Sequence, residues 1–272
     1  MKIFDGGMGS MLIKYPEYSG KDPALLNLTH PEIISEVHQK YALAGAEYIT
    51  TNTFDVNPLK YSNYEEIIDA AIKLARKTGC KIVLDIGPIG QLMYPMGLLK
   101  PEEAYEMFSK IVRAGNSADL IIIETMIDEN ELECAIKAAK DSSSLPIFAT
   151  CAFNQRGRLL TTGARPADVV ALAEKYGIDA VGTNCSFGPD KMLPVVEAFA
   201  SLTSLPIIAQ PNAGLPRTED GQAVYDVDID GFVLGVKALV SAGASIIGGC
   251  CGTTPDYIEA LVKEFNCCFS TI

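Results

Sequence analysis

Short apolar runs alternate with longer amphipathic stretches along the whole chain. The runs have the length of buried strands, and the stretches between them have apolar residues at helical spacing. We therefore predict eight strands, at residues 2–5, 48–51, 82–86, 120–124, 147–150, 180–183, 207–210 and 245–247. Eight helices are predicted at residues 31–44, 64–78, 101–114, 128–140, 166–176, 191–202, 231–242 and 255–265.

Local signals support the boundaries of these helices. Proline stands in the first turn at Pro31, Pro101 and Pro166, where its missing N–H is not needed. Glycine follows several of the helices, for example at Gly115 and Gly177, where a left-handed residue ends a helix at little cost. The pattern is therefore one of strands and helices in regular alternation.

Eight strand–helix repeats within 272 residues predict an α/β fold, namely a single (β/α)8 TIM barrel. An open doubly wound sheet is the competing arrangement, but the glycines at residues 6–9 lack the dinucleotide-binding pattern. No low-complexity linker divides the chain. We expect one domain over residues 1–272, with a short C-terminal tail from about residue 266.

Charge and cysteine content exclude several classes of partner. The formal net charge is −12 and the pI is about 4.7, which argues against binding to nucleic acid or to an anionic membrane. The apolar runs are too short to span a bilayer, and the amino terminus has no signal-peptide pattern. Eight cysteines without the spacing of a small disulfide scaffold indicate reduced thiols and a cytoplasmic location.

Two adjacent thiols, Cys250 and Cys251, follow the last predicted strand and are flanked by glycine. Adjacent cysteines seldom bond to each other without strain, so we interpret them as ligands for a soft metal; two small buried side chains are the alternative. Cys185 follows the strand at 180–183, and strand ends of a closed barrel converge on one mouth. Three thiolates suit zinc, which keeps a fourth position open in catalytic sites.

Other polar residues also follow predicted strands and are candidates for the same mouth. Asp5 and Glu124 could accept hydrogen bonds from an ammonium group, and the glycines at 6 and 7 let the backbone approach an anion. A turn role is the alternative for Asp5 and Asn212, and a helix-cap role for Glu124. Cys151 also ends a strand, but we interpret it as a core residue. The two cysteines at 267 and 268 are expected to lie in the C-terminal tail.

Several motifs together resemble the homocysteine S-methyltransferase family. They are GTNCS and GGCCGTTP, DGGMGS at the start, TNTF after the second strand, and the segments LLNLTHPEII, ETM and PNAGLP. Within the family, the likeness is greatest to the homocysteine-binding module of cobalamin-dependent methionine synthase. The motifs occur in the same order and extend over nearly the whole chain.

The resemblance implies a zinc barrel in which Cys185, Cys250 and Cys251 hold Zn2+ and activate the thiol of homocysteine. It further implies that Asp5 and Glu124 receive the ammonium group of homocysteine, and that backbone amides near Gly6 and Gly7 receive its carboxylate. Asn212 matches an asparagine that occupies the fourth position on zinc before substrate arrives. We also count Asn184 among the substrate-binding residues, because hydrogen bonds beside Cys185 can orient the site.

The expected activity is methyl transfer to homocysteine, which yields methionine. Methionine synthases carry separate folate- and cobalamin-binding modules, and the 272 residues leave no room for either. We therefore expect the methyl group from methylcobalamin on a corrinoid protein that is a separate chain. One alternative is a self-sufficient barrel that uses S-methylmethionine or betaine. Others, from a non-enzyme class, are a zinc- or homocysteine-binding module and a redox sensor based on vicinal thiols.

Overall fold

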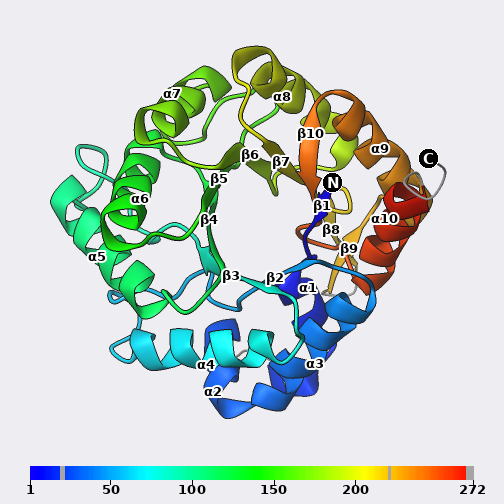
Figure 1. The fold of residues 1–272 in the computed structure, drawn as a ribbon, viewed down its shortest axis with the longest axis horizontal. Coiled ribbons are helices and arrows are strands. Elements are labelled where there is room, and N and C mark those ends of the chain that lie inside the picture. Colours follow the sequence, from blue (N-terminus) through cyan, green and yellow to red (C-terminus); the bar gives the residue numbers. More distant parts are fainter. Residues whose placement is uncertain (19–21, 220–221, 268–272) are drawn as a thin grey trace.

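The computed structural model describes residues 1–18, 22–219 and 222–267, and it confirms the predicted TIM barrel (Figure 1). Eight parallel strands form one sheet with the order β1-β10-β7-β6-β5-β4-β3-β2. These strands are β1 Lys2–Ile3, β2 Tyr48–Thr50, β3 Lys81–Ile86, β4 Leu120–Met126, β5 Ile147–Cys151, β6 Ala180–Asn184, β7 Ile207–Gln210 and β10 Ala244–Ile247.

The sheet closes on itself between its first two strands. Phe4 and Tyr48 form a parallel bridge, the Asp5 N–H donates to the Tyr48 carbonyl at 3.1 Å, and the Glu47 N–H donates to the Ile3 carbonyl at 2.9 Å. Closure leaves no free edge in the barrel sheet. It also places the carboxyl ends of all eight strands around one opening.

Helices surround the barrel, one after each strand or strand pair, as Figure 1 shows. The eight that follow the prediction are α3 Pro31–Leu43, α4 Tyr64–Arg76, α5 Pro101–Ala114, α6 Glu129–Ser142, α7 Pro166–Tyr176, α8 Pro189–Leu202, α9 Ile229–Ser241 and α10 Pro255–Cys267. Asp128 and Asp228 cap α6 and α9 by accepting from backbone amides. Gly177 ends α7 with a φ of 60°, a left-handed conformation that favours glycine.

The apolar core has two parts, one inside the barrel and one between the barrel and its helices. The inner cluster consists of Phe4, Val83, Leu120, Ile122, Phe148, Ala180, Ile208 and Ile246, with Tyr48 packed against it. Lys2 lies at the amino-terminal end of this cluster, with its ammonium 5.3 Å from the centroid of the Phe148 ring. Gly182 lets β6 and β7 approach closely, because a Cβ there would lie 1.9 Å from the Ile208 carbonyl oxygen.

Two parts of the structure go beyond the predicted elements. Before α3 lie α1 Met8–Leu12, two 3-10 turns at Pro16–Tyr18 and Pro23–Leu25, and α2 Leu26–Thr29. After β7, the strands β8 Pro216–Glu219 and β9 Gln222–Tyr225 form an antiparallel hairpin. The last helix reaches Cys267, two residues further than predicted, and residue 268 with the rest of the expected tail lies outside the described residues.

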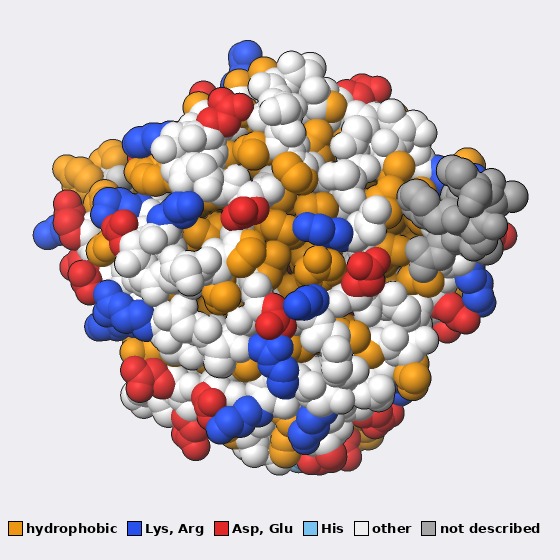
Figure 2. Space-filling view, in the orientation of Figure 1, with side chains coloured by type: hydrophobic (Ala, Val, Ile, Leu, Met, Phe, Trp, Pro, Cys, Tyr) orange, Lys and Arg blue, Asp and Glu red, His pale blue; other side chains and the backbone are white. Residues whose placement is uncertain are grey.

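The surface carries charges of both signs. Figure 2 shows acidic and basic side chains spread over one face, with hydrophobic side chains gathered between them near its centre. Within the described part of the chain, no helix is both long and apolar enough to cross a membrane. Acidic and basic side chains are interspersed on the face that Figure 2 shows.

Candidate metal and substrate site at the barrel mouth

A cavity of about 470 Å3 lies where the strands end, and polar side chains line its base. Side chains alternate along a strand, so the positions two residues beyond the inner apolar cluster point to the same axis. Thr50, Asp85, Glu124, Thr150 and Gln210 occupy these positions and form a polar layer above the apolar one, and Asn184, four residues beyond Ala180, lies at the end of β6. On these strands, polar side chains that face the barrel axis therefore follow the apolar layer directly.

Three sulfurs meet at one side of this cavity. The Sγ atoms of Cys185, Cys250 and Cys251 all lie within 4.8 Å of one another, and Cys185 and Cys251 are separated by 3.9 Å. None of the three forms a disulfide. All three side chains are partly accessible and line the cavity. Residues about 65 positions apart in the chain therefore present thiols to one point, as the barrel geometry predicts.

Backbone hydrogen bonds fix the two segments that carry the thiols. The Cys185 N–H donates to the Gln210 carbonyl at 3.1 Å, and the Cys250 N–H donates to the Pro211 carbonyl at 2.9 Å. Cys185 itself has a φ of 57°, a left-handed conformation that is uncommon outside glycine. Such backbone strain persists where the surroundings enforce it, and it is typical of functional sites.

Close backbone approach explains the glycines at 6 and 7. A Cβ on Gly7 would lie 2.6 Å from the Cys250 carbonyl oxygen, and a Cβ on Gly6 would lie 2.6 Å from Thr253 Oγ1. Only glycine therefore lets the loop after β1 pack against the loop that carries the double cysteine. The Gly7 N–H already donates to Thr253 Oγ1 at 3.2 Å.

The thiols influence one another's ionisation. Hydrogen bonds from Cys250 and Cys251 lower the pKa of the Cys185 thiol to about 3, because they stabilise its thiolate. Hydrogen bonding to Cys185 raises the pKa of Cys251 to about 12, and it raises that of Cys250 well above its usual range. Without a cation, the cluster thus holds one negative charge readily and resists further ionisation.

Asn212 supports the cysteine loop. Its Oδ1 accepts from the Cys251 N–H at 3.0 Å, and its side chain also bonds to the Cys185 sulfur. The residue is 4% exposed and is not among those that line the cavity. The oxygen considered as a metal ligand in the sequence analysis is therefore engaged by a backbone amide.

The predicted acids lie at the base of the cavity. Asp5 accepts from both the N–H and the hydroxyl of Thr50, each at 2.8 Å, yet burial raises its pKa to about 7. Burial, followed by the charges of Cys185 and Asp5, raises the pKa of Glu124 to about 8. A cation placed between the two carboxyl groups therefore stabilises their ionised forms.

Asn184 holds Glu124 and the end of β4 in place. Its Oδ1 accepts from the Thr125 N–H and the Thr150 hydroxyl, both at 2.9 Å. Its Nδ2 donates to Thr125 Oγ1 at 2.7 Å and to Glu124 Oε2 at 3.3 Å. The side chain is fully buried and does not line the cavity, so it acts on the site through Glu124 and Thr125.

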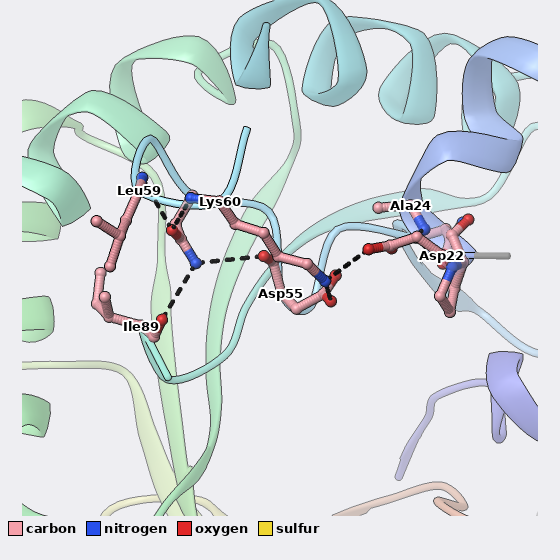
Figure 3. A network of polar contacts seen from close by, with 9 residues as sticks. Asp22, Ala24, Asp55, Leu59, Lys60 and Ile89 are labelled. Atoms are coloured by element: carbon pink, nitrogen blue, oxygen red, sulfur yellow. Dashed lines mark hydrogen bonds and ion pairs between the residues drawn. The ribbon is translucent and has the colours of Figure 1, made fainter. Parts of the chain in front are cut away.

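A charged network supports the outer wall of the cavity (Figure 3). Lys60 forms ion pairs with Asp22, at 2.7 Å, and with Asp55. Burial lowers the pKa of Lys60, but the hydrogen bonds that its ammonium donates to the two carboxylates outweigh this effect and raise the pKa overall. Asn57 adds contacts from the same loop, since its Nδ2 donates to the carbonyls of Asp55 and Ile89. The network joins the loop after β2 to neighbouring segments.

Asp85, Asp55, Lys60 and Tyr225 have no role in the predictions from the sequence. Asp85 and Asp55 line the cavity, as does Tyr225 from the hairpin. Tyr225 packs on Gly252, where a Cβ would lie 2.3 Å from its ring. Cys151 is fully buried and does not line the cavity, and burial raises the pKa of its thiol.

Comparison with known proteins identifies relatives over the full length of the barrel. The profile described as homocysteine S-methyltransferase matches residues 2–265. Methionine synthase of Mycobacterium leprae (strain TN) is 26% identical over 296 aligned positions, which cover 98% of this chain and 24% of that protein. Methionine synthase of Mycobacterium tuberculosis (strain ATCC 25618 / H37Rv) is 27% identical, and the alignment covers 94% of this chain and 24% of that protein. The chain thus spans about a quarter of the length of these two relatives.

Solved structures with the same fold include the homocysteine methyltransferase MmuM from Escherichia coli. Its apo form is 26% identical with a TM-score of 0.77, and the match covers 97% of this chain and 95% of that one. Its metallated form is 24% identical with a TM-score of 0.79, and the match covers 97% of this chain and 96% of that one. The likeness extends over nearly all of both chains.

Proposed function

The chain belongs to the homocysteine S-methyltransferase family, and we propose that it methylates the sulfur of homocysteine beside a zinc ion to make methionine. The observation that carries this proposal is the convergence of Cys185, Cys250 and Cys251 on one wall of the cavity. A packed core gains nothing from gathering three partly accessible thiols at strand ends. A metal with a vacant position toward the cavity accounts for the arrangement.

The three cysteines fit zinc in donor type and in spacing. Tetrahedral zinc–thiolate bonds of about 2.3 Å put ligand sulfurs about 3.8 Å apart, close to the 3.9 Å between Cys185 and Cys251. Zinc also offsets the charge repulsion that keeps three clustered thiols from ionising together. When bound, zinc supplies acidity, because a thiol that coordinates it is deprotonated at neutral pH. Asn212 could act as a fourth ligand only if its Oδ1 left the Cys251 N–H.

The remaining residues orient an amino-acid substrate. Asp5 and Glu124 offer carboxylate oxygens to the ammonium group of homocysteine, and Asn184 holds Glu124 toward the cavity. The backbone near Gly6 offers amides to the substrate carboxylate, at a point where glycine permits close approach. Fixing both ends of the substrate directs its sulfur to the cysteine cluster, which reduces the entropy lost in the reaction.

We propose a methylcorrinoid carried by another polypeptide as the methyl donor. Exposed large apolar side chains on the loops around the mouth support a protein partner there; they are Phe54, Leu59, Leu92, Tyr94, Met96, Leu98 and Leu160. Apolar side chains gathered around a cleft are typical of an interaction surface. Similarity to methionine synthases agrees with this choice of donor.

A small cationic donor such as S-methylmethionine or betaine is the second candidate. It is favoured by the match to MmuM, which covers 95% of that homocysteine methyltransferase chain. The cavity of about 470 Å3 is larger than one small amino acid needs, and acids and aromatic rings line it. Both candidates share the same zinc and homocysteine chemistry.

A donor panel tests the proposal. Zinc-loaded protein and homocysteine are mixed in turn with methylcobalamin, S-methylmethionine, betaine and methyltetrahydrofolate, and methionine is measured by mass spectrometry. We expect turnover with methylcobalamin, which is lost in Cys251→Ser. Turnover with a small cation instead supports the second candidate. Binding of homocysteine without turnover by any donor, including a methylated corrinoid protein, would contradict an enzymatic role and favour a binding module.

A further inference from the structure

One carboxylate oxygen at the base of the cavity has no donor. Asp85 is 5% exposed and lines the cavity, and its Oδ1 is buried without a hydrogen-bond partner in the described part of the chain. An acceptor buried in this way costs free energy unless a ligand or water supplies a donor. The backbone of Asp85 itself is hydrogen-bonded on both sides, since its N–H donates to Thr51 Oγ1 and its carbonyl accepts from the Thr53 hydroxyl. The unpaired oxygen is therefore not a result of a loose backbone.

The position of Asp85 places its carboxyl next to the predicted amine subsite. Asp85 is paired in register with Ile122 on β4, and Glu124 stands two residues further along that strand, on the same side. Burial raises the pKa of Asp85 well above its usual range, and the charges of Glu124, Asp5 and Asp55 raise it further. Proximity to all three acids agrees with a common cluster at the base of the cavity.

The four acids of the cavity differ in what they bind within the protein. Asp55 pairs with Lys60, Asp5 accepts two bonds from Thr50, and Glu124 accepts one from Asn184. Among the described residues that line the cavity, none is Lys, Arg or His. A cation that pairs with Asp5, Glu124 and Asp85 must therefore come from a ligand, and of the four acids Asp85 is the one with a buried carboxylate oxygen that has no donor.

We propose that Asp85 is a third carboxyl of the amine subsite and makes the site specific for thiols that carry an α-ammonium group. An ammonium has three N–H donors, so it can bond to Asp5, Glu124 and Asp85 together. The role follows from the proposed function, because it assumes that homocysteine is the thiol. In the free protein the unpaired Asp85 carboxyl does not stabilise the fold, and it gains a donor when the amine binds.

The test compares homocysteine with its desamino analogue, 4-mercaptobutanoate, by calorimetry on zinc-loaded protein. Asp85→Asn should weaken homocysteine binding by about 10-fold to 100-fold, the range for a charged hydrogen bond, and leave the analogue within about 2-fold. Asp55→Asn is the matched control, since it removes an acid of the same cavity that Lys60 already neutralises. It should leave the ratio of the two affinities unchanged.

A thermal melt of Asp85→Ala gives a second readout that does not depend on binding. If the carboxyl serves only the substrate, removing it should leave the melting temperature of the free protein unchanged or raise it. Equal weakening of both thiols by Asp85→Asn, or a lower melting temperature for Asp85→Ala, indicates a structural role and overturns the inference. An unchanged preference for homocysteine over the analogue in Asp85→Asn also overturns the inference. If the wild type binds neither thiol, the proposed function fails instead.

Discussion

Asn184 offers a quantitative test of how the barrel positions its site. The change Asn184→Ala removes the acceptor for the Thr125 N–H and for the Thr150 hydroxyl, both at the buried end of the strands. A buried donor left unpaired costs about 1–3 kcal/mol, so the two together cost about 4 kcal/mol. For a domain of this size each kcal/mol lowers the melting temperature by about 2–4 °C. We therefore expect a decrease of about 10 °C in a thermal melt.

Asn116→Ala is the matched control for this variant. Asn116 makes one exposed hydrogen bond, from its Nδ2 to the Ser142 carbonyl at 3.2 Å, so its loss should cost no more than about 0.5 kcal/mol. Asn184→Ala should also raise the KM for homocysteine, because Glu124 loses the donor that orients it. If both variants melt within about 2 °C of the wild type, Asn184 does not hold the strand ends as argued.

Two further predictions concern acids at different depths of the structure. Glu124→Ala should weaken homocysteine binding by about 10-fold or more while zinc content is unchanged; unaltered binding in calorimetry would show that Glu124 does not contact the amine. Burial raises the pKa of Glu131 from 4.5 to about 7, against a hydrogen bond from the Ile89 N–H. The folded state therefore binds a proton that the unfolded chain has released, and stability falls as pH rises from 4.5 to about 7. Relative to Glu131→Gln, the free energy of unfolding of the wild type, measured in urea, should fall by about 3 kcal/mol across this pH range. If the free energies of the two proteins change with pH in parallel, the assignment is refuted.

The elements of the barrel could be predicted from the sequence because each strand is a short apolar run between amphipathic helices. Predicted and observed strands agree within two residues at every boundary, and the helices begin near the expected prolines. The hairpin formed by β8 and β9 was not predicted, because residues 216–225 lack alternating apolar positions and are rich in polar residues. Its two strands pair only with each other, so they lack the buried apolar run that is typical of a strand in the barrel sheet.

The grouping of Cys185 with the double cysteine was predictable for a related reason. Closure of the barrel fixes which strand ends are neighbours, so a residue's place at a strand end determines its place at the mouth. Hydrogen-bond satisfaction cannot be inferred in this way. That Asn184 bonds to Glu124 while Asp85 remains unpaired depends on side-chain geometry, which strand position alone does not determine.

Metal content measured by mass spectrometry tests the zinc site most directly. Protein purified under reducing, metal-replete conditions should hold about one zinc per chain, and Cys185→Ser and Cys251→Ser should each lose most of it. Cys151→Ser should keep the metal, because that buried thiol does not line the cavity. A wild-type protein without zinc, or Cys185→Ser and Cys251→Ser variants that bind zinc as well as the wild type, would contradict a site built from the three converging sulfurs.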